Sequence, residues 1–284
     1  MTDPFQQVPP PAPKGRFAEL PSSLAKQAKF ETLAKESTEG VPALLAHPDW
    51  ETPAPTVIWM HGRTVNKELD PGRYLRWIRS GIAAVALDLP GHGERYSALL
   101  QKPDNTLKVV EQMLHELDHV VDTLRDPKWN GVFDMDRLAI GGMSAGGMVT
   151  LRRLGDPHPF KAAAVESTSG DFSLMPFYDT RYPRELIDRL DPLKHLDGWR
   201  AVPLLALHSE ADEWVPVQAI RTIGNAAGDG ARMALFNRSH RRRAHALAQR
   251  MRVVELTNRP DFQDLFVACT ALAPDPLASD PARA

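Results

Sequence analysis

The sequence is poor in cysteine and in net charge, and both shortages exclude a class of protein. A single cysteine, Cys269, among 284 residues allows no internal disulfide and no multi-cysteine zinc or iron–sulfur site. The formal net charge is -2, from 34 basic and 36 acidic residues. Dedicated nucleic-acid binders usually carry a strongly basic domain. We therefore expect neither a disulfide scaffold nor a partner that is a nucleic acid.

Long apolar runs are also missing. The sequence has no stretch of roughly 18 consecutive apolar residues, so it predicts no membrane-spanning helix and no membrane partner. The first residues, MTDPFQQVPPPAPKGR, lack the basic start and the apolar stretch of a secretory signal peptide. We expect a cytoplasmic protein.

What the chain does contain is typical of a globular domain with a sizeable core. Apolar residues make up 43% of it and charged residues 25%. Proline is concentrated at the two ends: six of the 25 prolines lie in residues 1–21 and three in residues 274–284. We expect flexible proline-rich tails over 1–21 and 274–284, and a single domain over 22–273.

Short apolar runs alternate with helical patterns through the middle of the chain. The runs lie at 55–59, 81–87, 137–140, 160–165, 202–207 and 231–236, and helical stripes lie at 70–80, 105–124 and 145–154. Runs that are apolar on both faces are typical of buried parallel strands. The alternation predicts an α/β fold, with a mostly parallel central sheet and helices on both faces. Active sites in such sheets lie at the carboxyl ends of the strands.

The most specific motif is the glycine-rich segment GGMSAGG at 141–147. Residues 142–146 form a G-x-S-x-G pattern between an expected strand and an expected helix. In that context the motif makes a sharp turn that lifts the serine into a strained, exposed position. The positions two before and two after the serine must be tiny, because the turn brings them nearly into contact. We predict Ser144 as a nucleophile and the N–H of Ala145, at the helix start, as an oxyanion donor.

Three further segments join this motif: His61-Gly62, DLPGHGER at 88–95 and HSEADEWVP at 208–216. With them the chain resembles the α/β-hydrolases, and most closely the dienelactone-hydrolase and prolyl-oligopeptidase-like serine esterases and peptidases. The resemblance covers about residues 40–220. It implies that the N–H of Arg63 is the second oxyanion donor. It also implies that Asp88 and His92, which suggest a metal or base site, belong to a structural turn.

A serine nucleophile needs a base, and the base needs a carboxylate that fixes its tautomer. The resemblance implies the chain order serine, acid, histidine. It places the acid about five residues past the strand at 202–207, shortly before Val-Pro. Asp212 meets both conditions. Asp171 is the alternative, since some members of the family carry the acid after the preceding strand.

The base is expected about 25–35 residues after Asp212. If 231–236 is the last strand, His240 lies on the following loop and is the candidate base, while His245 lies inside a helix over 241–251. If 252–256 is the last strand instead, its loop has no histidine and the triad is incomplete. The arginine-rich surroundings of both histidines differ from the glycine-flanked loop of the family, and we interpret these arginines as a solvated helix face.

Residues at about 166–201 form a short insert before the strand that precedes the acid. Met175, Phe177, Tyr178 and Tyr182 in this insert either line a substrate pocket or pack as ordinary core. An insert of this length favours small or modest substrates. We predict a serine hydrolase that cleaves a carboxylic ester through an acyl-enzyme, with no metal or organic cofactor. A peptidase of the same mechanism and a binding module without a working base remain alternatives, and the oligomeric state is open.

Overall fold

The computed structural model describes residues 20–176, 178–200, 202–210, 212, 214–226 and 231–236. Within these residues the strands are β1 (Ala28–Leu33), β2 (Val41–Ala46), β3 (Ala54–Met60), β4 (Ala83–Leu87), β5 (Phe133–Met143), β6 (Ala162–Glu166), β7 (Leu204–Ser209) and β8 (Ala231–Phe236). All six runs that the sequence identified are strands, β3 to β8. The boundaries expected for the two tails stay a prediction, because most of residues 1–21 and all of 274–284 lie outside this range.

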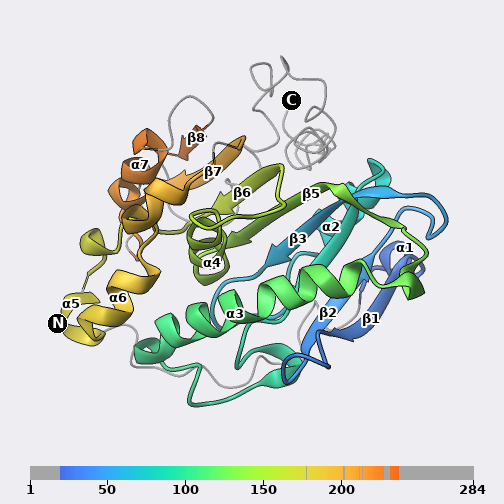
Figure 1. The fold of residues 1–284 in the computed structure, drawn as a ribbon, viewed down its shortest axis with the longest axis horizontal. Coiled ribbons are helices and arrows are strands. Elements are labelled where there is room, and N and C mark those ends of the chain that lie inside the picture. The colour runs from blue at the N-terminus through green and yellow to red at the C-terminus, as the bar shows by residue number, and fades with distance from the viewer. Residues whose placement is uncertain are drawn as a thin grey trace, which may run out of the picture.

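One eight-stranded sheet contains all of these strands, in the order β1-β2-β4-β3-β5-β6-β7-β8. The pairs β1–β2 and β2–β4 are antiparallel, and every other pair is parallel. Figure 1 shows the strands side by side, with the helices packed against the sheet. The mostly parallel sheet confirms the predicted fold class.

Three of the helices in the described residues lie where the helical stripes predicted them. The helices are α1 (Ser22–Ala25), α2 (Pro71–Arg79), α3 (Thr106–Leu124), α4 (Ala145–Arg153), α5 (Tyr178–Arg181), α6 (Arg184–Leu190) and α7 (Val217–Ala226), with short 3-10 turns such as η5 (Phe172–Leu174) and η6 (Pro192–Gly198). The stripes at 70–80, 105–124 and 145–154 correspond to α2, α3 and α4. In the part of the chain that is described, no helix is long and apolar enough to cross a membrane.

Alternation along the strands divides the core between the two faces of the sheet. Ile58 and Met60 of β3 belong to the larger core, which α3, α4 and α7 cover. Val57 and Trp59, one residue out of phase, belong to the second core, beneath α1 and α2. Successive side chains of a strand point to opposite faces. Because both faces of β3 are covered, the whole strand is apolar, and this made it readable from the sequence.

The two antiparallel strands at the N-terminal edge were not predicted. All six residues of β2 are buried. Pro42, however, has no backbone N–H to donate to a neighbouring strand, so a proline in this run argues against a central strand. In β1 only Leu33 is fully buried, so no continuous apolar run marks this edge strand. These strands extend the sheet on the side away from β6, β7 and β8.

The insert between β6 and β7 contains η5, α5, α6 and η6. Met175, Tyr178 and Tyr182 are buried within the larger core cluster, which agrees with the packing interpretation. Phe177 lies outside the described residues. The insert leaves the sheet at the carboxyl end of β6, so it borders the edge at which the site is expected (Figure 1).

Candidate active site

Ser144 occupies the sharp turn between β5 and α4, with φ 51° and ψ -114°. A positive φ of this kind is strained for a residue with a Cβ. Hydrogen bonds hold the turn: the Ser144 N–H donates to the carbonyl of Glu166, and the Met148 N–H donates to the carbonyl of Ser144, both at 2.9 Å. Thr168 Oγ1 donates to the same carbonyl at 2.7 Å. The backbone therefore has the strained geometry that the motif predicts for a nucleophile.

The motif glycines are required by close backbone approach. A Cβ on Gly142 would lie 2.5 Å from the backbone carbon of Gly146, and a Cβ on Gly146 would lie 2.3 Å from the carbonyl oxygen of Met60. No side chain fits at either position, so the expectation that both must be tiny is confirmed. The approach of Gly146 to Met60 also brings the end of β3 against the start of α4.

The loop His61-Gly62-Arg63 follows β3 and passes beside the nucleophile. A Cβ on Gly62 would lie 3.3 Å from the Cβ of Ser144. Ala145 is the first residue of α4, and the first N–H groups of a helix have no partner inside the helix. The structure thus brings both predicted oxyanion residues next to Ser144, Ala145 directly along the chain and Arg63 through Gly62.

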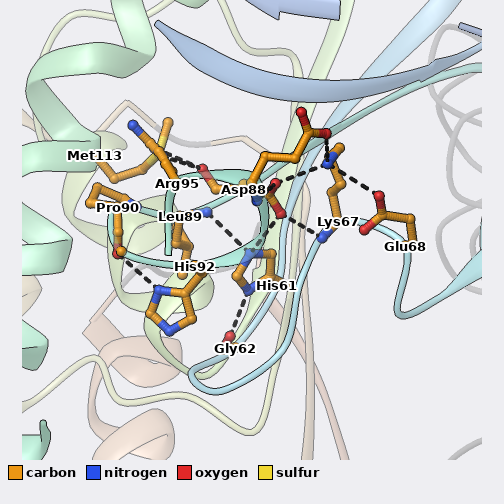
Figure 2. Close-up of polar contacts among 12 residues, drawn as sticks. His61, Gly62, Lys67, Glu68, Asp88, Leu89, Pro90, His92, Arg95 and Met113 are labelled. Carbon is orange, nitrogen blue, oxygen red and sulfur yellow. Dashed lines mark hydrogen bonds and ion pairs between the residues drawn. The ribbon is translucent and has the colours of Figure 1, made fainter. Parts of the chain in front are cut away.

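Buried polar contacts fix the position of this loop, as Figure 2 shows. Nε2 of His61 accepts the N–H of Leu89 at 3.1 Å, so the ring proton is on Nδ1, which donates to the Gly62 carbonyl at 2.6 Å. Oδ1 of Asp88 lies 3.7 Å from His61 Nε2 and accepts the N–H of Lys67 at 2.9 Å. Asp88, which follows β4, therefore lies near both His61 at the start of the loop and Lys67 a few residues further on.

Lys67 is a buried cation surrounded by three carboxylates. Its Nζ lies 2.9 Å from Asp88 Oδ2, 2.5 Å from Glu94 Oε1 and 3.1 Å from Glu68 Oε1. Burial alone would raise the pKa of Asp88, but the charge of Lys67 and the hydrogen bonds from Lys67 and from the N–H of Glu94 outweigh burial and lower the pKa to about 2. The Lys67–Asp88 ion pair is therefore charged at neutral pH.

His92 packs beneath the same loop, with its ring 5.3 Å from that of His61 between centroids. Its side chain is fully buried, and Nδ1 lies 2.8 Å from the Pro90 carbonyl oxygen. Burial and the neighbouring His61 lower the pKa of His92 to about 4. A buried neutral ring of this kind packs the turn. The turn at Asp88 and His92 is thus structural, as the resemblance implies.

The two acid candidates both cap turns through one oxygen. Oδ1 of Asp212, in the loop after β7, accepts the N–H groups of Trp214 and Val215, both at 2.9 Å. Oδ1 of Asp171 accepts the N–H of Ser173 at 3.0 Å and its hydroxyl at 2.5 Å. The Asp212 side chain is 7% exposed. In both residues these hydrogen bonds go to Oδ1 and not to Oδ2.

A buried histidine, His208, lies near the second oxygen of Asp212. Its Nε2 lies 3.9 Å from Asp212 Oδ2 and 2.9 Å from the Val215 carbonyl oxygen, to which it donates. The Nε2 proton of His208 is thus used in the hydrogen bond to the Val215 carbonyl. The predicted bases, His240 and the alternative His245, lie outside the described residues, as does the alternative strand at 252–256.

Three charged residues that support the Ser144 turn or the neighbouring loop were not recognised from the sequence: Lys67, Arg73 and Glu166. Arg73 Nη2 lies 2.8 Å from Glu166 Oε1, and the backbone of Glu166 holds Ser144. The one available signal was the position of Glu166 directly after a buried strand. Lys67 and Arg73 lie in a polar loop and on an amphipathic helix, where charges usually face solvent.

A strained serine between β5 and α4, at the carboxyl edge of a mostly parallel sheet, belongs to the serine hydrolases with the α/β-hydrolase fold. The family model described as the prolyl oligopeptidase family matches residues 73–237, more than half of the chain, and the chain belongs to this family. It is a serine hydrolase. A second model, described as the C-terminal domain of RACo, the ASKHA domain, matches residues 213–279.

The chain is similar to one curated esterase in sequence and to two of the solved structures in fold. Esterase YjfP of Escherichia coli K12 is 26% identical over 213 residues, which are 69% of this chain and 84% of the relative. TT1662 from Thermus thermophilus superposes with a TM-score of 0.56 and 21% identity, over 74% of this chain and 87% of its own. A puromycin-hydrolyzing peptidase from Mycobacterium tuberculosis gives a TM-score of 0.61 and 22% identity, over 77% of this chain but 36% of its own.

Proposed function

We propose that this protein hydrolyses carboxylic esters of small or modest size through an acyl-enzyme. Ser144 attacks the ester carbonyl, and His240 takes the serine proton and passes it to the leaving alcohol. Asp212 holds the tautomer of His240. The N–H groups of Arg63 and Ala145 stabilise the oxyanion, and water activated by the same histidine then releases the acid.

The observation that carries this proposal is the backbone of Ser144, φ 51° and ψ -114°, at the end of β5. Strain of this size persists only where the surroundings enforce it, and it is concentrated at functional sites. Here Glu166, Thr168 and the glycine contacts enforce it. A half-buried serine beside the first N–H of α4 and the N–H of Arg63 is the arrangement that acyl transfer requires.

Strand direction supports the other two members of the triad. β7 and β8 are parallel neighbours, so the residues that follow them leave the sheet at the same edge. Asp212 follows the end of β7 by three residues, and His240 follows the end of β8 by four. Both are downstream of Ser144, in the chain order of α/β-hydrolases.

The preference for esters rests on how much of each similar protein's length this chain spans. The chain spans 84% of esterase YjfP but 36% of the puromycin-hydrolyzing peptidase and 42% of an acylaminoacyl peptidase. The short insert between β6 and β7 supports a substrate of modest size. The prolyl oligopeptidase family match favours a second candidate, a peptidase with the same residues in the same roles.

A fluorophosphonate probe and a substrate panel test the proposal. The wild type should react with the probe, and Ser144→Ala should not, because only an activated serine is phosphonylated. We expect turnover of 4-nitrophenyl esters over a range of acyl lengths, and much slower turnover of matched 4-nitroanilides. Faster cleavage of the anilides would favour the peptidase. A wild type that neither reacts with the probe nor hydrolyses any ester would refute both.

A further inference from the structure

Arg63 is a half-buried arginine that forms no ion pair with a carboxylate of the described residues, and Asp104 acts on its charge only from beyond ion-pair distance. Its Nη2 donates to the Gln101 carbonyl oxygen. Its Nε is buried without a hydrogen-bond partner. A guanidinium has five N–H donors, so most of its hydrogen-bonding capacity is unused in this part of the chain.

Other largely buried arginines in the described residues have a counter-ion. Each of the following lies 2.8 Å from a carboxylate oxygen: Arg73 from Glu166, Arg95 from Glu116, and Arg153 from Asp118. Removal of a cation from water is costly unless it is paired. For Arg63 the cost shows in its pKa, which burial lowers. An unpaired buried cation needs an explanation, and a bound anion supplies one.

The backbone of Arg63 lies beside the nucleophile. Gly62, the preceding residue, is in contact with Ser144, since a Cβ on Gly62 would lie 3.3 Å from the Ser144 Cβ. The Arg63 guanidinium reaches the carbonyl of Gln101, on the loop that leads into α3. The Arg63 side chain therefore extends from the loop after β3 toward residues 101–103, which contact Tyr182 of the insert.

Aromatic residues of the insert border the same space. Tyr178 and Tyr182 lie close enough to Arg63 to act on its charge. The Tyr178 hydroxyl lies 3.6 Å from Sδ of Met148, one helical turn after Ser144. The Tyr182 hydroxyl donates to the Pro103 carbonyl at 2.5 Å. The half-buried guanidinium thus contacts the 101–103 loop and lies near two buried tyrosines of the insert.

We propose that the Arg63 side chain is a subsite for a carboxylate group carried by the ester substrate, on its acyl part or on its alcohol part. The proposal rests on the proposed esterase function. A carboxylate there replaces the missing counter-ion, and the planar guanidinium binds it through two parallel hydrogen bonds. The side chain then selects the substrate, while the backbone N–H of the same residue serves the oxyanion.

Matched substrate pairs separate the two possible positions of the carboxylate. The acyl pair is 4-nitrophenyl hydrogen adipate and the uncharged 4-nitrophenyl hexanoate. The alcohol pair is 4-acetoxybenzoate and its uncharged methyl ester. For each pair the measured quantity is the ratio of kcat/KM, charged over uncharged. In the wild type we expect this ratio to favour the charged member in one pair.

Substitution of the side chain leaves its backbone N–H in place, so the ratio reports on the subsite. Arg63→Met should lower the ratio of the favoured pair by about 10- to 100-fold, the range for loss of charge-assisted hydrogen bonds. Arg63→Lys keeps the charge without the planar fork and should give an intermediate ratio. The control is Arg184→Met, on the exposed face of α6, where the side chain is 76% exposed; it should keep the wild-type ratio.

Binding to the Ser144→Ala variant gives a readout that does not depend on turnover. Calorimetry should show tighter binding of the charged ester than of the uncharged ester, and the difference should disappear when Arg63→Met is added. Equal ratios in wild type and Arg63→Met for both pairs, or equal affinity of both esters for Ser144→Ala, would overturn the subsite. If the wild type hydrolyses no ester, the proposed function fails, and the calorimetry alone decides the subsite.

Discussion

Arg73 Nη2 lies 2.8 Å and 2.9 Å from the two carboxylate oxygens of Glu166, whose backbone carbonyl accepts the N–H of Ser144. The Arg73 guanidinium also lies 4.0 Å from the centroid of the Trp59 ring. Helix α2 is therefore connected to the strained turn through one side chain. The strain at Ser144 is supported from the opposite face of the sheet, as well as by the helix that follows it.

Breaking this pair should destabilise the fold and loosen the turn. Arg73→Met leaves the Glu166 carboxylate largely buried and unpaired, so we expect a loss of about 3 kcal/mol of unfolding free energy. Urea denaturation measures it. The double variant Arg73→Met/Glu166→Gln should be more stable than the sum of the single variants predicts, because neither charge is then left alone. Strict additivity would contradict coupling between the two side chains.

Backbone strain at Ser144 predicts an unusual ranking of two inactive variants. Glycine populates positive φ without a Cβ penalty. Ser144→Gly should therefore be more stable than Ser144→Ala, by about 1 kcal/mol. At an interior position of a helix the order would be reversed, because glycine destabilises a helix relative to alanine. Thermal and urea unfolding of the two proteins compare them directly, and an alanine variant at least as stable as the glycine variant would argue against strain.

Lys67 should matter most at neutral pH. The pKa of Asp88 is lowered to about 2, so its contacts stabilise the fold above about pH 4, and this contribution is lost as the pH falls through 2. From that shift the contribution is about 2 kcal/mol. Lys67→Met removes the buried cation, so burial should raise the pKa of Asp88 instead. The variant should then be destabilised at pH 7 by about 3 kcal/mol.

The pH dependence provides the control for this prediction. A carboxyl with a raised pKa accepts a proton as the pH falls, so the deficit of Lys67→Met relative to the wild type should shrink between pH 7 and pH 5. Urea unfolding at both pH values measures this deficit. Lys108→Met, at an exposed position of α3, should show little deficit at either pH. A deficit of Lys67→Met that is constant over this range would count against the ion pair.

The parts of the fold that sequence predicted share one physical property: burial on both faces. The apolar runs within β3, β4, β5, β6 and β7 are buried because helices cover both sides of the sheet, and such runs can be recognised without knowledge of the neighbouring strand. The edge strand β1 has no such property, since Lys29 and Phe30 face solvent. A half-exposed edge strand is defined by its ladder partner, which local sequence does not reveal.

The same contrast holds in the site. Ser144 was identified from the sequence because close backbone approach permits only glycine at 142 and 146, which leaves a visible pattern. Lys67 and Asp88 are 21 residues apart and meet only through the fold, so no local signal shows that they form a pair. Residues selected for local backbone geometry are predictable, whereas residues selected for a partner across the sheet are not.

The identity of the acid can be decided by two asparagine variants. Asp212→Asn keeps the shape of the side chain but weakens its hold on the catalytic histidine, and turnover should fall by roughly 10⁴-fold, as in the best-studied triad. Asp171→Asn should lower turnover much less, because Asp171 follows β6 and we place the acid after β7. Initial rates with one 4-nitrophenyl ester are sufficient. The opposite ranking would move the acid to the loop after β6.

The base is testable through the pH profile of turnover. A histidine must be neutral to accept the serine proton, so activity should fall as the pH drops through its pKa, nominally about 6.5. His240→Ala should remove the activity, and with it this acidic limb. His245→Ala should retain both, since we expect His245 within a helix. The matched alanine variants differ only in position, so a shared loss of stability can be checked by urea unfolding.

Each result of this comparison has a distinct meaning. Loss of activity in His245→Ala alone would show that the chain after β8 runs differently from the prediction. Retention of activity in both variants would exclude both histidines, and His208 would not replace them, because its Nε2 already donates to the Val215 carbonyl at 2.9 Å. If in addition the wild type does not react with a fluorophosphonate, the strained Ser144 has no base. The protein would then bind ligands at this site without cleaving them.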